Sequence, residues 1–127
     1  MAALSAILAI SVGAACGAVF RWRLGELLNP IFPTIPFGTL AANIIGGFLI
    51  GTFIALTHDR RLLPEVLKLA ITTGFLGGLT TFSTFSAETV MLFAGQEYLY
   101  GMLMVGLHVG GSLLATVLGS MFIKLFI

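Results

Sequence analysis

The sequence has very little charge. Only 9% of its 127 residues are Asp, Glu, Lys or Arg, and 58% are hydrophobic, whereas soluble domains carry about 25% charged residues. The net charge is +1, and the longest basic run is Arg60-Arg61, so the chain lacks the basic patch of a nucleic-acid binder. These shortages exclude a soluble domain and a nucleic-acid partner. They predict a protein whose main solvent is lipid.

Cysteine is nearly absent as well. Cys16 has no second cysteine with which to form an intrachain disulfide or a cysteine zinc site. It lies in an apolar stretch, and we expect it to be a small buried residue. The N-terminal residues lack the positive region of a secretory signal, and the apolar run is too long for one. We therefore expect the first apolar segment to remain in the mature protein.

Four long apolar segments make up most of the chain. They predict transmembrane helices at about residues 3–28, 37–57, 66–94 and 98–124, because roughly 20 apolar residues span the hydrocarbon core. Too few residues remain outside these segments to build a separate catalytic domain. We expect one transmembrane domain, residues 1–127, that is not an enzyme.

The third segment is too long and too rich in glycine for one straight helix. As a single rod it would be about 43 Å long at 1.5 Å per residue, against a hydrocarbon core of about 30 Å. Its middle reads Gly74-Phe75-Leu76-Gly77-Gly78-Leu79-Thr80-Thr81. We predict that this helix is broken near its middle, at residues 75–80. A break exposes backbone carbonyls at membrane depth, and a hard cation such as sodium would satisfy them.

Charge and small residues indicate how the helices are arranged. Because an excess of Lys and Arg in short loops sets orientation, the small excess here is consistent with insertion in both directions. Four cations fall on the side of the termini and two on the other: Arg60, Arg61, Lys68 and Lys124 against Arg21 and Arg23.

Gly-x-x-x-Gly pairs predict close helix packing in every segment; they are Gly13/Gly17, Gly47/Gly51, Gly74/Gly78 and Gly106/Gly110.

Polar side chains interrupt these helices, and polar groups that face lipid are costly. We expect them either to line water or to face a second subunit; they are Asn43, Ser83, Thr84, Ser86, Glu88, His108 and Ser112. His108 is interpreted as a hydrogen-bonded structural group with no assigned chemistry. For Glu88, anchoring near an interface and a role as an intramembrane acid both stay open.

Phe82 and Phe85 are three residues apart and share one helix face, beside a row of hydroxyls. Such a pair is commonly core filler. The alternative is an anion path, because a phenyl ring has a positive edge. Ring edges with hydroxyl and amide protons nearby can replace part of the hydration shell of a small anion.

The string from Gly74 to Glu88, GFLGGLTTFSTFSAE, resembles the signature of the Fluc, or CrcB, fluoride channels. Arg21-Trp22, Gly38-Thr39-Leu40 with Asn43, and Gly110-Gly111-Ser112 follow in the family's order and spacing. The resemblance covers nearly the whole chain. It implies an antiparallel homodimer of dual topology in the bacterial plasma (inner) membrane. It also implies two fluoride pathways at the subunit interface and a structural sodium ion at the dimer centre.

The resemblance also implies roles for individual residues. Phe82 and Phe85 would be the pore phenylalanines. The main-chain oxygens of Gly77 and Thr80 would bind sodium, and Arg21 would attract anions near a vestibule. Met104 stands where some relatives carry tyrosine, which leaves that position without a hydroxyl. The polar lining of the pathway would consist of Asn43, Ser83, Thr84 and Ser112.

The leading hypothesis is a channel that exports cytoplasmic fluoride passively. Fluoride enters acidified cells as neutral hydrogen fluoride, ionises, and leaves through the pore. A second class is a proton-coupled, small dual-topology exporter that uses Glu88 as its coupling acid. Small exporters of that kind carry their key acid in the first helix, which here has none before Arg21. A third class is a membrane scaffold that conducts nothing.

Overall fold

The computed structural model describes residues 1–58 and 63–126, and the regular elements in these ranges are all helical. Four segments are long and apolar enough to cross a membrane: Ala2–Ile31, Phe37–Thr57, Glu65–Ala94 and Tyr98–Lys124. The prediction of an all-α, multi-pass membrane protein is therefore confirmed. Arg60 and Arg61, on which the orientation argument partly depends, lie outside the described residues.

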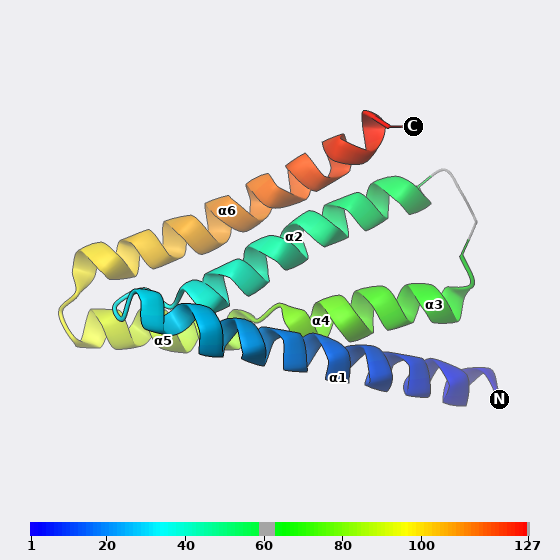
Figure 1. Cartoon of the computed structure of the whole chain (residues 1–127), viewed down its shortest axis with the longest axis horizontal. Helices are drawn as coiled ribbons and strands as arrows, with labels where there is room; N and C mark the ends of the chain where they lie inside the picture. Colours follow the sequence, from blue (N-terminus) through cyan, green and yellow to red (C-terminus); the bar gives the residue numbers. More distant parts are fainter. Residues whose placement is uncertain (59–62, 127) are drawn as a thin grey trace.

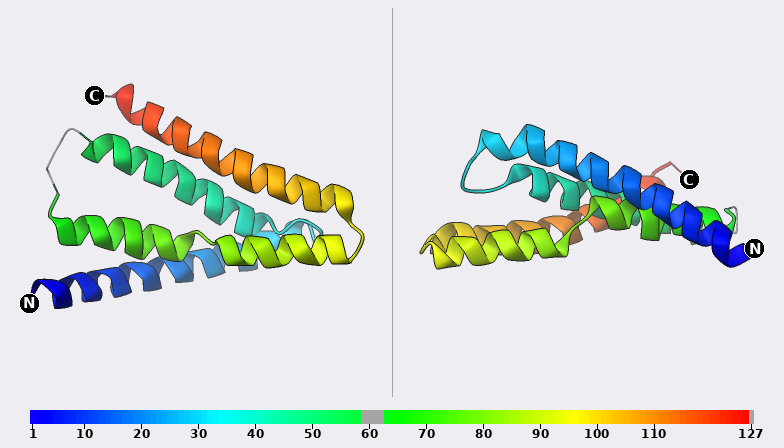
Figure 2. Two further views of the ribbon diagram at one scale, coloured as in Figure 1. Left: turned by 180° about the vertical axis from the view of Figure 1, so that it is seen from behind. Right: turned by 90° about the horizontal axis from the view of Figure 1, so that it is seen from below.

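The elements follow one another along the chain as labelled in Figure 1. They are α1 (Ala2–Leu28), the 3-10 turn η1 (Asn29–Ile31), α2 (Phe37–Thr57), α3 (Glu65–Leu69), the π-helical turn η2 (Ala70–Leu76), α4 (Gly77–Leu79), α5 (Phe82–Ala94) and α6 (Tyr98–Lys124). Both chain ends lie at the same end of the molecule, as an even number of crossings requires. α2 packs against α6, while α1 packs against η2, α4 and α2. Viewed from below, α1 and α5 diverge toward the end away from the termini (Figure 2).

Glycine lets α1 touch the third segment backbone to backbone. A Cβ placed on Gly17 would collide with the carbonyl oxygen of Phe75 and lie 2.7 Å from the Leu79 nitrogen. In the other direction, a Cβ on Gly78 would collide with the Ala14 carbonyl. Only glycine allows this separation, as in other small-residue helix contacts in lipid. The predicted close packing is confirmed here.

The structure also tests the expectations for two further glycine pairs and for Cys16. A Cβ on Gly51 would collide with the Thr116 carbonyl, which confirms close packing of α2 on α6. Gly106 and Gly110 differ, since a Cβ on either would meet nothing within 4 Å among the described residues of the protomer. Cys16 is exposed, so the prediction that it is buried was wrong. α1 turns Gly17, not its neighbour, toward the third segment.

The third segment changes conformation at two threonines. Residues from Glu65 to Leu79 are helical through α3, η2 and α4, whereas Thr80 (φ −82°, ψ 154°) and Thr81 (φ −150°, ψ 121°) are extended. α5 then begins at Phe82. The extended residues come at the end of, and just after, the range 75–80 predicted for the interruption. The glycine-rich residues stay helical because their small surfaces pack against α1.

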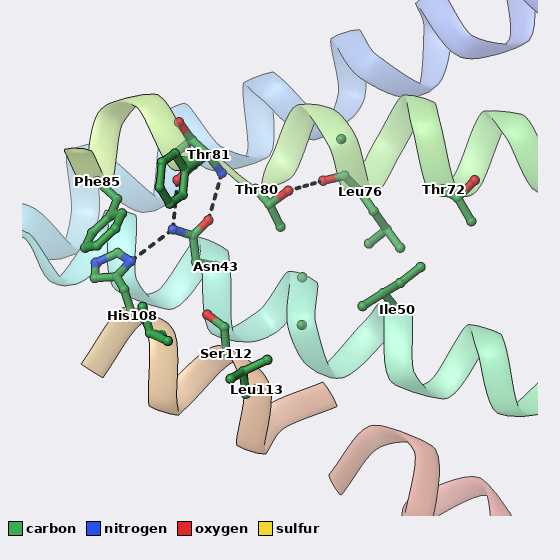
Figure 3. Close-up of a pocket in the computed structure, with 15 residues that line it drawn as sticks. Asn43, Ile50, Thr72, Leu76, Thr80, Thr81, Phe85, His108, Ser112 and Leu113 are labelled. Atoms are coloured by element: carbon green, nitrogen blue, oxygen red, sulfur yellow. Dashed lines mark hydrogen bonds between the residues drawn. The ribbon is translucent and has the colours of Figure 1, made fainter. Parts of the chain in front are cut away.

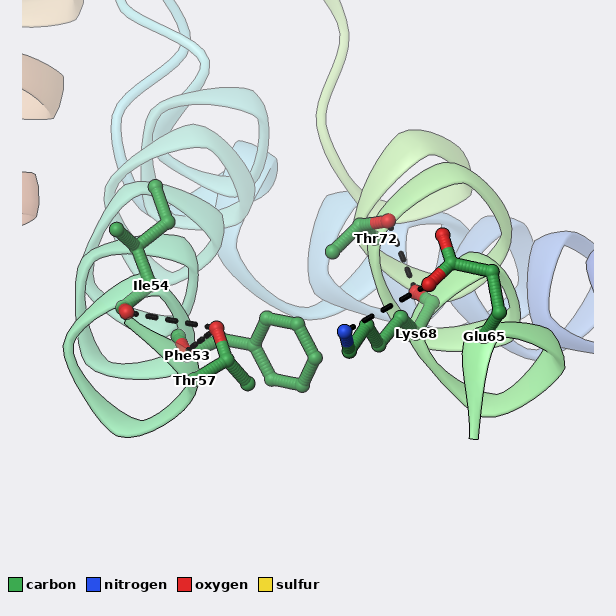
Figure 4. A network of polar contacts seen from close by, with 6 residues as sticks. All are labelled: Phe53, Ile54, Thr57, Glu65, Lys68 and Thr72. Atoms are coloured by element: carbon green, nitrogen blue, oxygen red, sulfur yellow. Dashed lines mark hydrogen bonds and ion pairs between the residues drawn. The ribbon is translucent and has the colours of Figure 1, made fainter. Parts of the chain in front are cut away.

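At the end nearest the termini, polar side chains of α2, α3 and η2 bind groups of their own helical segment (Figure 4). The Thr57 hydroxyl donates to the Phe53 carbonyl at 2.8 Å, and the Thr72 hydroxyl donates to the Lys68 carbonyl at 2.9 Å. Lys68 also lies 3.6 Å from the Glu65 carboxylate, one turn earlier. These contacts lie within single helical segments.

Candidate functional site

The Asn43 side chain binds both backbone polar groups of Thr81 (Figure 3). The Thr81 N–H donates to Asn43 Oδ1 at 2.7 Å, and Asn43 Nδ2 donates to the Thr81 carbonyl at 2.9 Å. This pairing resembles the one between neighbouring strands, because the side-chain amide offers one donor and one acceptor. A non-helical residue at membrane depth needs such partners. Asn43, projecting from α2, therefore stabilises the extended step.

In a continuous helix, the carbonyls of Gly77 and Thr80 would each accept a hydrogen bond from a backbone N–H. Here side chains accept from those N–H groups instead. The carbonyl oxygen of Gly77 would accept from the Thr81 N–H, which instead goes to Asn43. The carbonyl oxygen of Thr80 would accept from the Thr84 N–H, which instead goes to the Thr81 hydroxyl at 3.1 Å. Both carbonyls thus lose their helical donors.

These free carbonyls suit a hard cation. No three His, Cys, Asp or Glu side chains within residues 1–58 and 63–126 come together in a way that could hold a metal ion. Hard cations prefer oxygen ligands, backbone carbonyls included. The main-chain oxygens of Gly77 and Thr80 fit the predicted sodium ion in chemistry.

The start of α5 sets the position of the two predicted pore phenylalanines. Thr81 caps the helix through its hydroxyl, the usual role of Thr before the first turn. The Phe82 and Phe85 rings then meet edge to face, with centroids 5.5 Å apart and planes at 65°. Phe82 is 78% exposed and Phe85 only 7%. One ring thus faces outward from the protomer, while the other lies within it.

Phe85 and Asn43 both contact His108 on α6. The imidazole stacks on the Phe85 ring with centroids 4.5 Å apart and planes at 26°. Its Nδ1 lies 3.0 Å from Asn43 Nδ2. The expectation that His108 is hydrogen-bonded is confirmed. Through His108, Asn43 connects the Phe85 ring of α5 with the extended step and with α6 (Figure 3).

A pocket of about 500 Å³ opens beside this network. None of its lining residues is Asp, Glu, Lys or Arg, so its polar groups are hydroxyls, amides, carbonyls and one imidazole. Neutral donors can bind an anion without the strong hold of a fixed positive charge. The pocket brings together six of the predicted site residues: Asn43, Gly77, Thr80, Phe82, Phe85 and Ser112.

Other predicted residues lie around a second pocket, of about 470 Å³, between α1, α2 and α5. Arg21, Thr84 and Glu88 line it. The Arg21 Nε donates to the Gly78 carbonyl at 3.0 Å, and the Thr39 hydroxyl donates to Glu88 Oε1 at 2.8 Å. Ser83 lines neither pocket, and its hydroxyl lies 3.3 Å from that of Thr81. The candidate residues therefore form two groups.

Sequence reasoning missed Thr81 and the contacts of His108. Thr81 was read only as part of a glycine-rich string, although it supplies both the helix cap and the backbone groups that Asn43 binds. The available signal was the spacing of Thr39 and Asn43 on one face of α2, and of Met104, His108 and Ser112 on one face of α6. Spacing shows which residues share a face but not which partner that face meets.

Comparison with known proteins identifies the family. Residues 8–120 match the family described as CrcB-like protein, Camphor Resistance (CrcB). The chain is 53% identical over 121 residues to the fluoride-specific ion channel FluC of Nitrosospira multiformis, covering 95% of this chain and 94% of that one. It is 57% identical over 116 residues to FluC of Aromatoleum aromaticum, covering 91% and 88%. FluC of Chromobacterium violaceum is 52% identical over 113 residues, covering 89% and 90%. Together with the four apolar helices, these matches show that the chain belongs to the CrcB family.

Proposed function

We propose that this protein is a fluoride-selective ion channel that exports cytoplasmic fluoride by passive electrodiffusion. The observation that carries the proposal is the Phe82–Phe85 edge-to-face pair, held beside hydroxyl and amide donors in a pocket without charged lining residues. The relatives named above are fluoride-specific ion channels, and channels of this kind catalyse no chemical reaction. In acidified surroundings hydrogen fluoride crosses the membrane as a neutral molecule and ionises inside. The channel gives the trapped ion a way out.

The pathway is completed by a second, antiparallel copy of the chain. Phe82 is 78% exposed in the protomer, which supports a partner on that face. Gly106 and Gly110 also leave α6 open to close approach. The small excess of Lys and Arg on one side, four against two, is consistent with dual topology. Labelling a cysteine introduced at one chain end from both sides of the membrane would support this arrangement, and labelling from one side alone would contradict it.

The bacterial plasma (inner) membrane is the proposed location. The relatives named above are bacterial, and proteins that span the bacterial outer membrane are β-barrels rather than helical bundles. All four spanning segments here are helical. Lipid contacts would then cover the exposed apolar side chains that no second copy buries.

A structural sodium ion would bind the main-chain oxygens of Gly77 and Thr80, near the dimer centre. A bound sodium ion would give a partner to carbonyls that have lost their helical donors. Replacing sodium by N-methyl-D-glucamine, with chloride as the common anion, is expected to lower the unfolding temperature of the purified protein, because a ligand of the folded state stabilises it. Potassium serves as the size control. Equal unfolding temperatures in all three cations would contradict the site.

Fluoride efflux from liposomes that hold the purified protein tests the function. The channel predicts electrogenic efflux that is faster than from protein-free liposomes and indifferent to an imposed proton gradient. Glu88 lies in the second pocket, apart from the phenylalanine pair, so Glu88→Gln should not change that indifference. Efflux that follows the proton gradient and stops in Glu88→Gln would favour the proton-coupled exporter. Rates equal to protein-free leakage would refute transport altogether.

Replacing Phe82 or Phe85 by isoleucine is expected to lower fluoride efflux about tenfold or more. Isoleucine keeps an apolar side chain but removes the positive ring edge, and hydrogen-bond-like contacts with a charged partner are worth about 1.5–3 kcal/mol. The measurement is initial efflux rate per dimer, with size-exclusion elution as the check on assembly. Phe93→Ile, which changes a ring in the last turn of α5, is the matched control. Wild-type efflux in both variants would show that Phe82 and Phe85 only fill the protein core and do not contact the ion.

A further inference from the structure

The half-buried side chain of Arg21 binds a backbone oxygen of the third segment. Its Nε donates to the Gly78 carbonyl at 3.0 Å. Arg21 also lines the second pocket together with Glu88, yet the two side chains form no ion pair in the ranges that the structure describes. The partner of this cation is therefore the end of a helix and not the acid of the same pocket.

The Gly78 carbonyl lies where the first half of the third segment ends. In a continuous helix it would accept from the Phe82 N–H, but α4 ends at Leu79 and α5 begins a separate helix at Phe82. A carbonyl at membrane depth then needs another donor. The C-terminal end of a helix also carries a partial negative charge, which favours a cation. The Arg21 guanidinium provides both the donor and the charge.

The close packing of α1 brings the Arg21 side chain to this oxygen. Gly17 and Arg21 are one turn apart and share a face of α1. A Cβ on Gly17 would collide with the Phe75 carbonyl, and a Cβ on Gly78 would collide with the Ala14 carbonyl. The two backbones therefore touch immediately before Arg21. At that separation the inner nitrogen of the side chain, Nε, meets the Gly78 oxygen.

The two carbonyls proposed to bind sodium come just before and just after Gly78 in the sequence. Gly77 and Thr80 line the first pocket, whereas Gly78 does not. The Leu76 carbonyl is occupied, because it accepts from the Thr80 N–H at 3.0 Å and from the Thr80 hydroxyl at 2.8 Å. Hydrogen bonds beside a metal site orient its ligands. Arg21 supplies such a bond from the α1 side.

We propose that Arg21 is a positioning residue of the sodium site. Its Nε holds the Gly78 carbonyl, and this bond fixes the end of α4 so that the carbonyls of Gly77 and Thr80 stay arranged for one cation. The inference rests on the sodium ion proposed above. The positive charge of Arg21 opposes a second cation, because like charges repel. The hydrogen bond, and not the charge, is therefore what Arg21 contributes to the site.

Three substitutions separate the hydrogen bond from the charge. In Arg21→Gln the amide nitrogen occupies the place of Nε, so the donor stays and the charge is lost. In Arg21→Lys a methylene occupies that place, so the charge stays and the donor lies one atom farther out. Arg21→Met removes both. Arg23→Gln is the matched control, because it removes a charge two residues away from an exposed pair with Glu26.

The measurement is the unfolding temperature of each purified protein as sodium chloride replaces N-methyl-D-glucamine chloride, which gives an apparent sodium dissociation constant. Loss of a hydrogen bond beside a metal site commonly weakens metal binding by at least about tenfold, and we expect that rise in the constant of Arg21→Met. Arg21→Gln should stay within about threefold of wild type or bind more tightly. Arg21→Lys should bind more weakly than Arg21→Gln, and Arg23→Gln should match wild type.

A contact that only stabilises the fold would lower the unfolding temperature at every sodium concentration and leave the sodium constant unchanged. That result in Arg21→Met, or weaker sodium binding in Arg21→Gln than in Arg21→Lys, would overturn the proposal. If Arg21→Met does not fold, the comparison of the Gln and Lys variants decides. A wild-type unfolding temperature that does not respond to sodium would defeat the sodium site itself, and the role of Arg21 with it. None of these readouts uses fluoride efflux, so a failure of the channel function is a separate result.

Discussion

Replacing Gly17 by alanine is expected to leave little or no folded protein. The added Cβ would collide with the Phe75 carbonyl and stand 2.7 Å from the Leu79 nitrogen. Both are backbone atoms of a helical segment, so no side chain can rotate away. Overpacking costs about 1–3 kcal/mol and occasionally more, and here the strain also separates α1 from η2 and α4, its main contacts in the fold. The measurement is thermal unfolding in detergent, with the yield of monodisperse protein.

Gly25→Ala is the matched control on the same helix. A Cβ there would lie 3.5 Å from the side-chain nitrogen of Asn29, an ordinary contact. Alanine is about 1 kcal/mol more favourable than glycine inside a helix, so this variant should be as stable as wild type or slightly more stable. If Gly17→Ala and Gly25→Ala unfolded at the same temperature, the close approach of α1 and the third segment would be wrong.

Asn43→Leu is expected to abolish fluoride efflux and to destabilise the fold strongly. Leucine has similar size but no polar atoms, so the N–H and carbonyl of Thr81 lose their partners. Each buried orphan group costs about 1–3 kcal/mol, and water cannot replace the amide cheaply at membrane depth. His108 Nδ1 loses its donor as well. Thermal unfolding and liposome efflux measure the two effects.

Thr52→Val is the control for this substitution. It also replaces a polar side chain on α2 by an apolar one of similar size, and it removes one hydrogen bond, from the Thr52 hydroxyl to the Gly119 carbonyl at 3.2 Å. A typical bond of this kind contributes about 1 kcal/mol, and Thr52 does not line the pocket of the phenylalanine pair. Efflux should persist. If Asn43→Leu had the same unfolding temperature and efflux rate as Thr52→Val, the Thr80–Thr81 step would not depend on Asn43.

Glycine spacing illustrates how far sequence reasoning reached. The Gly13/Gly17 and Gly74/Gly78 pairs predicted close contacts, and the structure confirms that they meet each other across two segments. The same spacing at Gly106 and Gly110 meets nothing within the described protomer. A spacing rule describes the surface of one helix, and whether another helix reaches that surface depends on the rest of the fold.

The interruption of the third segment shows a similar limit. Length and glycine content predicted that a straight helix would not run from residue 66 to 94, but glycine content placed the change at 75–80. Glycine lowers helix propensity, yet contacts with α1 keep residues up to Leu79 helical. The extended residues are the two whose polar groups Asn43 and a helix cap can satisfy.

The sequence alone determined that this is an integral membrane protein with four transmembrane helices. Its low charge and long apolar runs were sufficient for that conclusion. These properties are local, because in lipid each helix must satisfy its own backbone. Which side chains meet was decided only by the tertiary structure. Asn43 contacts Thr81 across 38 residues and His108 across 65, and the stack on Phe85 follows from that meeting. Contacts at such separations depend on the packing of whole helices, so the polar row on each helix could not show which partner it meets.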